Sequence, residues 1–96
     1  CPQMPTAAFP HDHSAMSGRT LKVDNEDQPY FQQIFWAGMV VNAYLPSTVF
    51  PTGLSREGLP IGLQAVSAPY RDYRTIEFAR LISREIGGFV PPSNYA

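Results

Sequence analysis

Apolar residues crowd one stretch in the middle of the chain with hardly a polar break. Residues 29–43 read Pro-Tyr-Phe-Gln-Gln-Ile-Phe-Trp-Ala-Gly-Met-Val-Val-Asn-Ala, which places apolar side chains on nearly every face of a helix. Proline suits the first helical position, and the acidic residues just before it favour the positive end of a helix. A helix that is apolar all round belongs in the interior of a larger body. We therefore expect a buried helix over residues 29–43, with other polypeptide around it.

Two short apolar runs follow, and residues typical of turns separate them. Residues 47–50 are β-branched or aromatic and lie between two prolines, and residues 61–66 form the second run. Gly58, between the runs, is expected to adopt a positive φ. Their short separation favours an antiparallel pair, because a parallel crossover needs about a dozen residues. Residues 46–66 are thus predicted to form a strand–turn–strand unit.

Residues 70–87 show the clearest helical periodicity in the chain. Their apolar side chains recur at spacings of three and four on one face: Ile76, Ala79, Ile82 and Ile86, with Phe78 widening the stripe. Asp72 is placed to cap the first turn, and Gly87-Gly88 ends the helix. This segment is predicted to be an amphipathic helix that covers one face of the sheet.

The two ends of the chain lack such periodicity. Residues 1–28 are rich in proline and polar turn residues and are predicted to be a connecting segment, and residues 88–96 are predicted to be a tail. The order helix, β pair, amphipathic helix indicates an α/β fold cut from a larger sheet. A first residue that is Cys1 rather than methionine agrees with a piece of a longer chain.

Composition points to protein rather than nucleic acid as the neighbour of these elements. Charged residues make up 16% of the chain, against roughly 25% in soluble domains. Seven basic and eight acidic residues leave a net charge of −1, so no basic field is available for nucleic acid. No apolar run approaches the roughly 20 residues of a membrane span. We expect a cytoplasmic protein whose isolated 96 residues self-associate through uncovered apolar surface.

Two proline- and glycine-containing segments resemble the C-terminal part of amidase-signature hydrolases. They read Leu-Pro-Ser-Thr-Val-Phe-Pro-Thr-Gly at residues 45–53 and Gly-Leu-Pro-Ile-Gly-Leu-Gln at residues 58–64. In that family a long helix follows, where residues 70–87 lie here, and residues 1–10 are similar to its proline-rich segment. The resemblance implies that residues 1–96 are the C-terminal portion of one amidase domain, with a mixed β-sheet covered by helices.

The resemblance also implies a chemistry that these residues cannot perform alone. The family hydrolyses amides with a serine nucleophile, a second serine and a lysine. This chain has no adjacent serine pair, and its single lysine, Lys22, lies in a polar loop. We therefore expect no catalytic residue and no cofactor here, and an inactive chain in isolation. The remainder of the amidase chain and a small-molecule amide substrate are the expected partners.

The helical segment supplies the candidate substrate-binding residues. Four of them share one helical face at i, i+3, i+4 and i+7: Phe31, Ile34, Phe35 and Gly38. The resemblance places this face on the wall of the cleft that holds the acyl part of the substrate, with Cys1 as a further wall residue. Alternatively, the four helical residues belong to the hydrophobic core, and Cys1 is a small buried thiol.

Other chemistry and other functions stay open at this point. His11 and His13, at i and i+2 around Asp12, suit a metal on an extended strand, but a site needs three or four ligands, so a polar loop is favoured and no metal is expected. A triad built from these groups with Ser14 or Ser17 is not required by the spacing. Besides the small-molecule amidase, the alternatives are the tRNA-dependent amidotransferase subunit of the same family and a self-contained, non-enzymatic interaction module.

Overall fold

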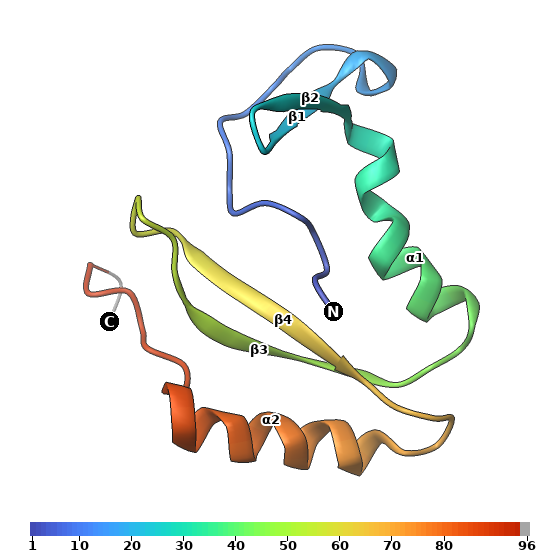
Figure 1. Ribbon diagram of the computed structural model, residues 1–96, viewed down its shortest axis with the longest axis vertical. Helices are drawn as coiled ribbons and strands as arrows, with labels where there is room; N and C mark the ends of the chain where they lie inside the picture. The colour runs from blue at the N-terminus through green and yellow to red at the C-terminus, as the bar shows by residue number, and fades with distance from the viewer. Residues whose placement is uncertain (95–96) are drawn as a thin grey trace.

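A computed structural model describes residues 1–94 of the chain (Figure 1). Its elements follow one another as η1 (Met16–Gly18), β1 (Thr20–Val23), β2 (Glu26–Pro29), η2 (Tyr30–Ile34), α1 (Phe35–Asn42), β3 (Ser47–Leu54), β4 (Pro60–Val66) and α2 (Asp72–Ile86), where η marks a 3₁₀ helix. Strand β1 pairs with β2, and β3 pairs with β4, each in a separate two-stranded antiparallel sheet. The chain thus mixes helices with small sheets, as an α/β protein does.

The β3–β4 hairpin is the predicted antiparallel pair, and the structure confirms it. Ser47 lies opposite Val66 at one end of the ladder. The prediction that β3 ends before Pro51 is wrong, because a register shift between Pro51 and Gly53 lets the strand continue to Leu54. A bulge is one of the few places where a strand accepts a proline, which has no N–H for the ladder.

The turn of this hairpin depends on backbone conformation and on one serine. Gly58 has a φ of 78°, as expected from its place in the turn. The Ser55 hydroxyl accepts hydrogen bonds from the backbone N–H groups of Glu57 and Leu59, both at 3.2 Å. These contacts satisfy the turn locally and fix the separation of the two strands.

Helix α2 lies against one face of β3–β4 (Figure 1). Thr75 and Ala79 are its buried residues. The Thr75 hydroxyl donates to the Asp72 carbonyl at 2.8 Å, which leaves the Thr48 hydroxyl of β3 as the donor in the 2.8 Å bond that joins the helix to the sheet. Beside this bond, the rings of Phe50 and Phe78 meet edge to face at 5.8 Å.

Two details predicted for α2 are wrong. The buried stripe is rotated toward Thr75. Ile76 and Ile86 are each about half exposed, because the helix meets the sheet through the small residues Thr75 and Ala79. Asp72 is the first helical residue instead of the cap, and no side chain caps the helix. The predicted end is confirmed, since Gly87 follows with a φ of 91°.

The apolar helix differs from its prediction in both geometry and burial. Residues 30–34 form a 3₁₀ helix, and α-helical geometry begins only at Phe35. Pro29 closes β2 instead of opening the helix. Val40 is the one buried residue of α1, so the helix predicted to be buried is largely exposed within the described chain.

An N-terminal hairpin lies within the segment predicted to be a plain connection. Strands β1 and β2 pair across a two-residue turn in which Asp24 and Asn25 both have positive φ. Such turns match the twist of the flanking strands and favour Asn and Asp. Leu21 is 3% exposed on the inner side of the hairpin, and Lys22 pairs with Asp27 on the outer side at 2.9 Å.

The first residues of the chain lie alongside β4. The backbone nitrogen of Cys1 donates to the Gln64 carbonyl at 2.8 Å, and the Gln64 N–H donates to the Cys1 carbonyl at 2.9 Å. The Gln64 side chain is buried and donates to the Pro2 carbonyl at 3.2 Å. The glutamine thereby ties the N-terminal segment to the sheet.

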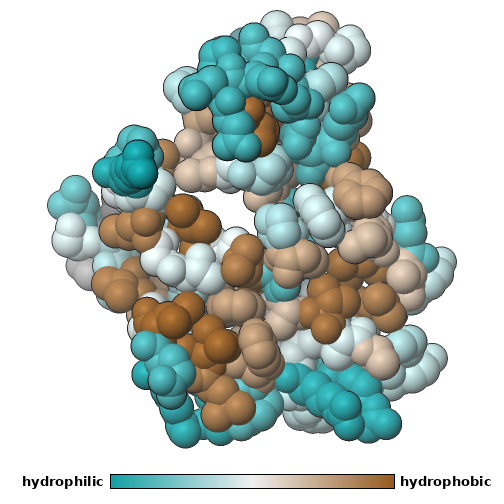
Figure 2. All heavy atoms as spheres, viewed as in Figure 1, coloured by the Kyte–Doolittle hydropathy of each residue, from teal (hydrophilic) through white to brown (hydrophobic). Residues whose placement is uncertain are grey.

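The chain buries too little of its apolar surface to close a core. Its accessible surface is 7701 Å², against about 5,500 Å² for a closed monomer of this mass. Its radius of gyration is 15.3 Å, against about 12.5 Å for a compact chain of this length. The buried hydrophobic residues in the described chain are Leu21, Val40, Phe50 and Ala79. Figure 2 shows apolar side chains on the surface around a gap through the molecule.

Hydropathy sets one further limit on the helices. Within residues 1–94, neither helix is both long enough and apolar enough to cross a bilayer.

The isolated 96-residue chain is expected to self-associate and to lack a sharp thermal transition. Uncovered apolar surface drives association, and the four buried hydrophobic side chains of residues 1–94 supply little cooperativity. Sedimentation velocity at several concentrations and calorimetry measure the two properties. A monomer with a single cooperative transition would contradict this expectation.

Candidate functional site

The predicted wall residues lie on the continuous helical run formed by η2 and α1. Phe31 and Ile34 are three residues apart in 3₁₀ geometry, which eclipses their side chains. Gly38 follows Ile34 by four residues, where the geometry has become α-helical. The run therefore keeps these three positions on one side, and Phe35 lies next to them.

All four positions are accessible in the described chain. The exposed fractions are 52% for Phe31, 48% for Ile34 and 61% for Phe35. A Cβ added at Gly38 would meet no atom within 4 Å. These residues are not core among the residues that the structure describes, so the face is open to a ligand or to further polypeptide.

Aromatic side chains dominate this open face. The ring of Phe35 meets that of Trp36 edge to face at 5.5 Å, and Tyr30 meets Phe31 in the same way at 6.4 Å. Edge-to-face pairs of this kind hold large rings in fixed relative positions. The face offers shape and apolar contact and few polar groups, which suits a hydrocarbon part of a ligand.

Cys1 is in a different place from the helical residues. Its backbone is paired with β4, and its thiol is free and exposed. The alternative of a small buried thiol is therefore wrong for the described chain. The structure brings together the four helical positions and leaves Cys1 on the sheet (Figure 1).

Several serine hydroxyls have structural partners, and the lysine has an acidic one. Ser67 donates to the Arg71 carbonyl at 2.9 Å, and Ser83 donates to the Ala79 carbonyl at 2.7 Å. Lys22 donates to Asp27 at 2.9 Å on the exposed side of the hairpin. These groups are thus engaged in local structure.

The histidine-rich loop does not assemble a triad. Asp12 accepts from the backbone N–H of Ser14 at 2.8 Å. The Ser14 hydroxyl, the same N–H and the nearby Arg19 hold the pKa of the Asp12 carboxyl below its ordinary value. The carboxylate therefore binds the loop backbone and does not orient His11 or His13. Across residues 1–94, no three histidine, cysteine or acidic side chains converge as a metal site would need.

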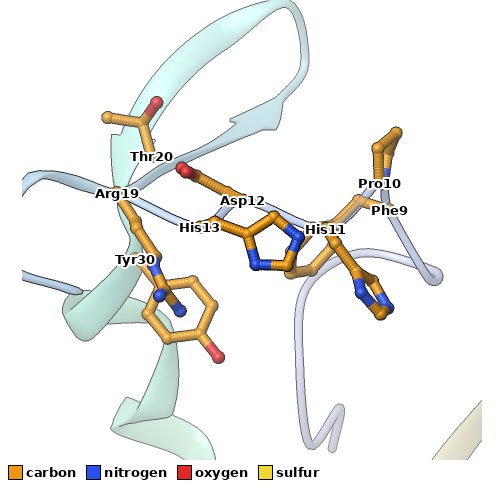
Figure 3. Close-up of a pocket in the computed structure, with 8 residues that line it drawn as sticks. All are labelled: Phe9, Pro10, His11, Asp12, His13, Arg19, Thr20 and Tyr30. Atoms are coloured by element: carbon orange, nitrogen blue, oxygen red, sulfur yellow. The ribbon is translucent and has the colours of Figure 1, made fainter. Parts of the chain in front are cut away.

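A cavity of about 290 Å³ opens between this loop and the N-terminal hairpin. Figure 3 shows the residues that line it: Phe9, Pro10, His11, Asp12, His13, Arg19, Thr20 and Tyr30. Sequence reasoning missed it because it left residues 1–28 without a hairpin. The signal that could have found the hairpin is the Asp24-Asn25 pair, typical of a two-residue hairpin turn, directly after the alternating run of residues 20–23.

Sequence comparison places these features among known proteins. No family model matches the chain. The chain is 39% identical over 51 residues to fatty-acid amide hydrolase 2 of Homo sapiens, which covers 53% of this chain and 10% of that protein. It is 32% identical over 91 residues to the A subunit of glutamyl-tRNA(Gln) amidotransferase from Brucella ovis and from Brucella canis, which covers 94% of this chain and 17% of each relative.

The names of the relatives are those of an amide hydrolase and of an amidotransferase subunit. Both kinds of relative are amidase-signature enzymes. The chain belongs to the amidase-signature family and spans about a tenth to a sixth of the length of the curated relatives that it matches.

Proposed function

We propose that this chain is the C-terminal portion of an amidase that hydrolyses the carbon–nitrogen bond of a small-molecule amide. In this proposal residues 1–96 form part of one amidase domain and supply sheet, covering helix and part of the substrate wall. The nucleophilic serine, the second serine and the lysine base lie elsewhere in the same chain. The lysine, through the bridging serine, takes the proton of the nucleophile, and backbone N–H groups stabilise the oxyanion.

The extent of the sequence similarity carries this proposal. It spans 94% of this chain but 17% of the amidotransferase relative, so most of such an enzyme has no counterpart here. Residues 58–64, which resemble the family, form part of the turn and most of β4. Gln64, within this segment, donates to the Pro2 carbonyl and so ties the N-terminal residues to the sheet. The family-like segment therefore contains Gln64, the buried residue of β4.

The uncovered surface supports the same proposal on physical grounds. The accessible surface of 7701 Å² exceeds that of a closed monomer by about 2,200 Å². Permanent interfaces bury about 2,000–5,000 Å² in total and are more apolar than transient ones. The face of β3–β4 that bears Val49 and Val66, and most of α1, are among the uncovered apolar regions. The remainder of the amidase chain is the proposed cover.

The proposed substrate wall consists of Phe31, Ile34, Phe35 and Gly38, with Cys1 as a further member. The helical positions are accessible and form one apolar side, as a wall for a neutral acyl chain requires. No orienting polar group on this face is needed, because the reacting amide would meet the catalytic residues beyond it. Cys1 is supported only by its exposure.

A second candidate is the corresponding part of a tRNA-dependent amidotransferase subunit. The similarity over 91 residues favours it, since the relatives matched at that length carry this name. The net charge of −1 and the exposed Phe35-Trp36 pair favour the small-molecule amidase, because nucleic-acid partners call for basic surface.

The complete coding sequence tests the proposal most simply. Upstream of Cys1 it should encode a glycine-rich segment with two serines and, well before that, a lysine. Replacing either the serine nucleophile or the lysine in the complete protein should lower kcat/KM for amide hydrolysis by at least about 1,000-fold. A reading frame without these elements would end the amidase assignment.

Substitution Phe35→Ala in the complete protein should change the preference among acyl chains. Removal of an aromatic wall is expected to shift the ratio of kcat/KM for long over short acyl amides by about tenfold, because pocket contacts discriminate by about 1–3 kcal/mol. Val41→Ala is the matched control, since Val41 is 70% exposed on another side of the same helix. An unchanged ratio together with a lowered melting temperature would make Phe35 a core residue.

A further inference from the structure

The cavity beside the N-terminal hairpin is built from three separate parts of the chain. Residues 9–13 form one wall, Arg19 and Thr20 enter at the start of β1, and Tyr30 follows β2 (Figure 3). Its volume of about 290 Å³ is at the small end of ligand pockets. The open cavity therefore suits a small ligand.

Arg19 gives the cavity a positioned permanent cation. Its Nε donates to the Ser14 carbonyl at 2.9 Å, which fixes the side chain against the loop. Neither of the two ion pairs found in residues 1–94 includes Arg19. Figure 3 shows its guanidinium on the Tyr30 side of the cavity. A guanidinium presents planar donors that match the oxygens of a carboxylate or sulfonate.

The one acidic side chain of the cavity is already occupied. Asp12 accepts the backbone N–H of Ser14 at 2.8 Å. Its carboxylate points toward Thr20, whereas the guanidinium of Arg19 and the ring of His13 lie on the side of Tyr30 (Figure 3). The Asp12 carboxylate therefore binds the loop backbone, and neither Arg19 nor His13 takes part in the ion pairs found in residues 1–94.

The remaining lining provides two imidazoles and apolar walls. The rings of His11 and His13 are 6.0 Å apart, and those of Phe9 and Tyr30 are 6.3 Å apart, each pair edge to face. Imidazole nitrogens donate or accept hydrogen bonds, so both rings offer polar partners to a ligand beside Arg19. The aromatic rings offer contact for an apolar body attached to the charged group.

We propose that this cavity binds a small organic acid, with its anionic oxygens on Arg19 and the histidines and its apolar body between Phe9 and Tyr30. The titratable and charged groups that face the ligand are His11, His13, Asp12, Arg19 and Tyr30. The proposal rests on this cavity alone and is independent of the amidase assignment.

Benzenesulfonate is a suitable probe, because it is anionic near neutral pH and is not an amide. Its affinity for the complete protein is measured by ligand-observed NMR titration at about pH 7. Methyl phenyl sulfone, a neutral analogue of the same shape, should bind at least about tenfold more weakly than benzenesulfonate.

Variants assign the binding to the cavity. Arg19→Gln should weaken benzenesulfonate at least about tenfold, and His13→Gln should also weaken it without touching the Arg19–Ser14 bond. Arg56→Gln is the control, because Arg56 is exposed in the β3–β4 turn and outside the cavity. A thermal melt shows whether Arg19→Gln is folded. If it is unfolded, the affinity of His13→Gln decides whether the ligand binds in this cavity. Equal binding of the neutral analogue, or unchanged affinity in the folded variants, would overturn the proposal.

Discussion

The amount of apolar surface that these residues leave uncovered constrains everything else about the molecule. A chain of this size normally buries about 60–65% of its extended surface, whereas this one, at 7701 Å² exposed, buries about half. Hydrophobic burial is what offsets the conformational entropy lost on folding. A helix such as α1, with Val40 as its buried residue, is stable only if further atoms cover its other sides. The same exposure leaves Phe31, Ile34 and Phe35 accessible.

Within that limit, a small set of specific contacts defines the packed part of the chain. The bond between Thr48 and Thr75 fixes α2 on the sheet, and buried Gln64 holds the N-terminal segment on β4. Gly62 lies where an added Cβ would come within 3.2 Å of the Phe50 carbonyl, so the two strands approach closely there. The family-like segments thus build a scaffold from which the helical run with the proposed wall extends (Figure 1).

Local chemistry made much of the fold predictable, and packing decided the rest. Gly58 and Gly87 mark positive φ values that few other residues accept, so the turn and the helix end could be predicted. The rotation of the α2 stripe toward Thr75 could not, because it depends on how Thr75 meets Thr48 across the helix and the sheet. The same holds for the cavity, where Arg19 and Tyr30 meet only because the missed hairpin brings them together. The helical wall positions could be chosen by spacing, yet their exposure depends on what covers α1.

Hydroxyl-radical footprinting of α1 tests most directly whether other parts of an amidase cover this surface. Phe35, Trp36 and Met39 are each more than a third exposed in the 96-residue chain. In the complete protein, the oxidation rates of Trp36 and Met39 are expected to be at least about tenfold lower than in the isolated chain under conditions that keep it monomeric. Equal rates in the two proteins would contradict the account, because the apolar helix would then be exposed in the complete protein as well.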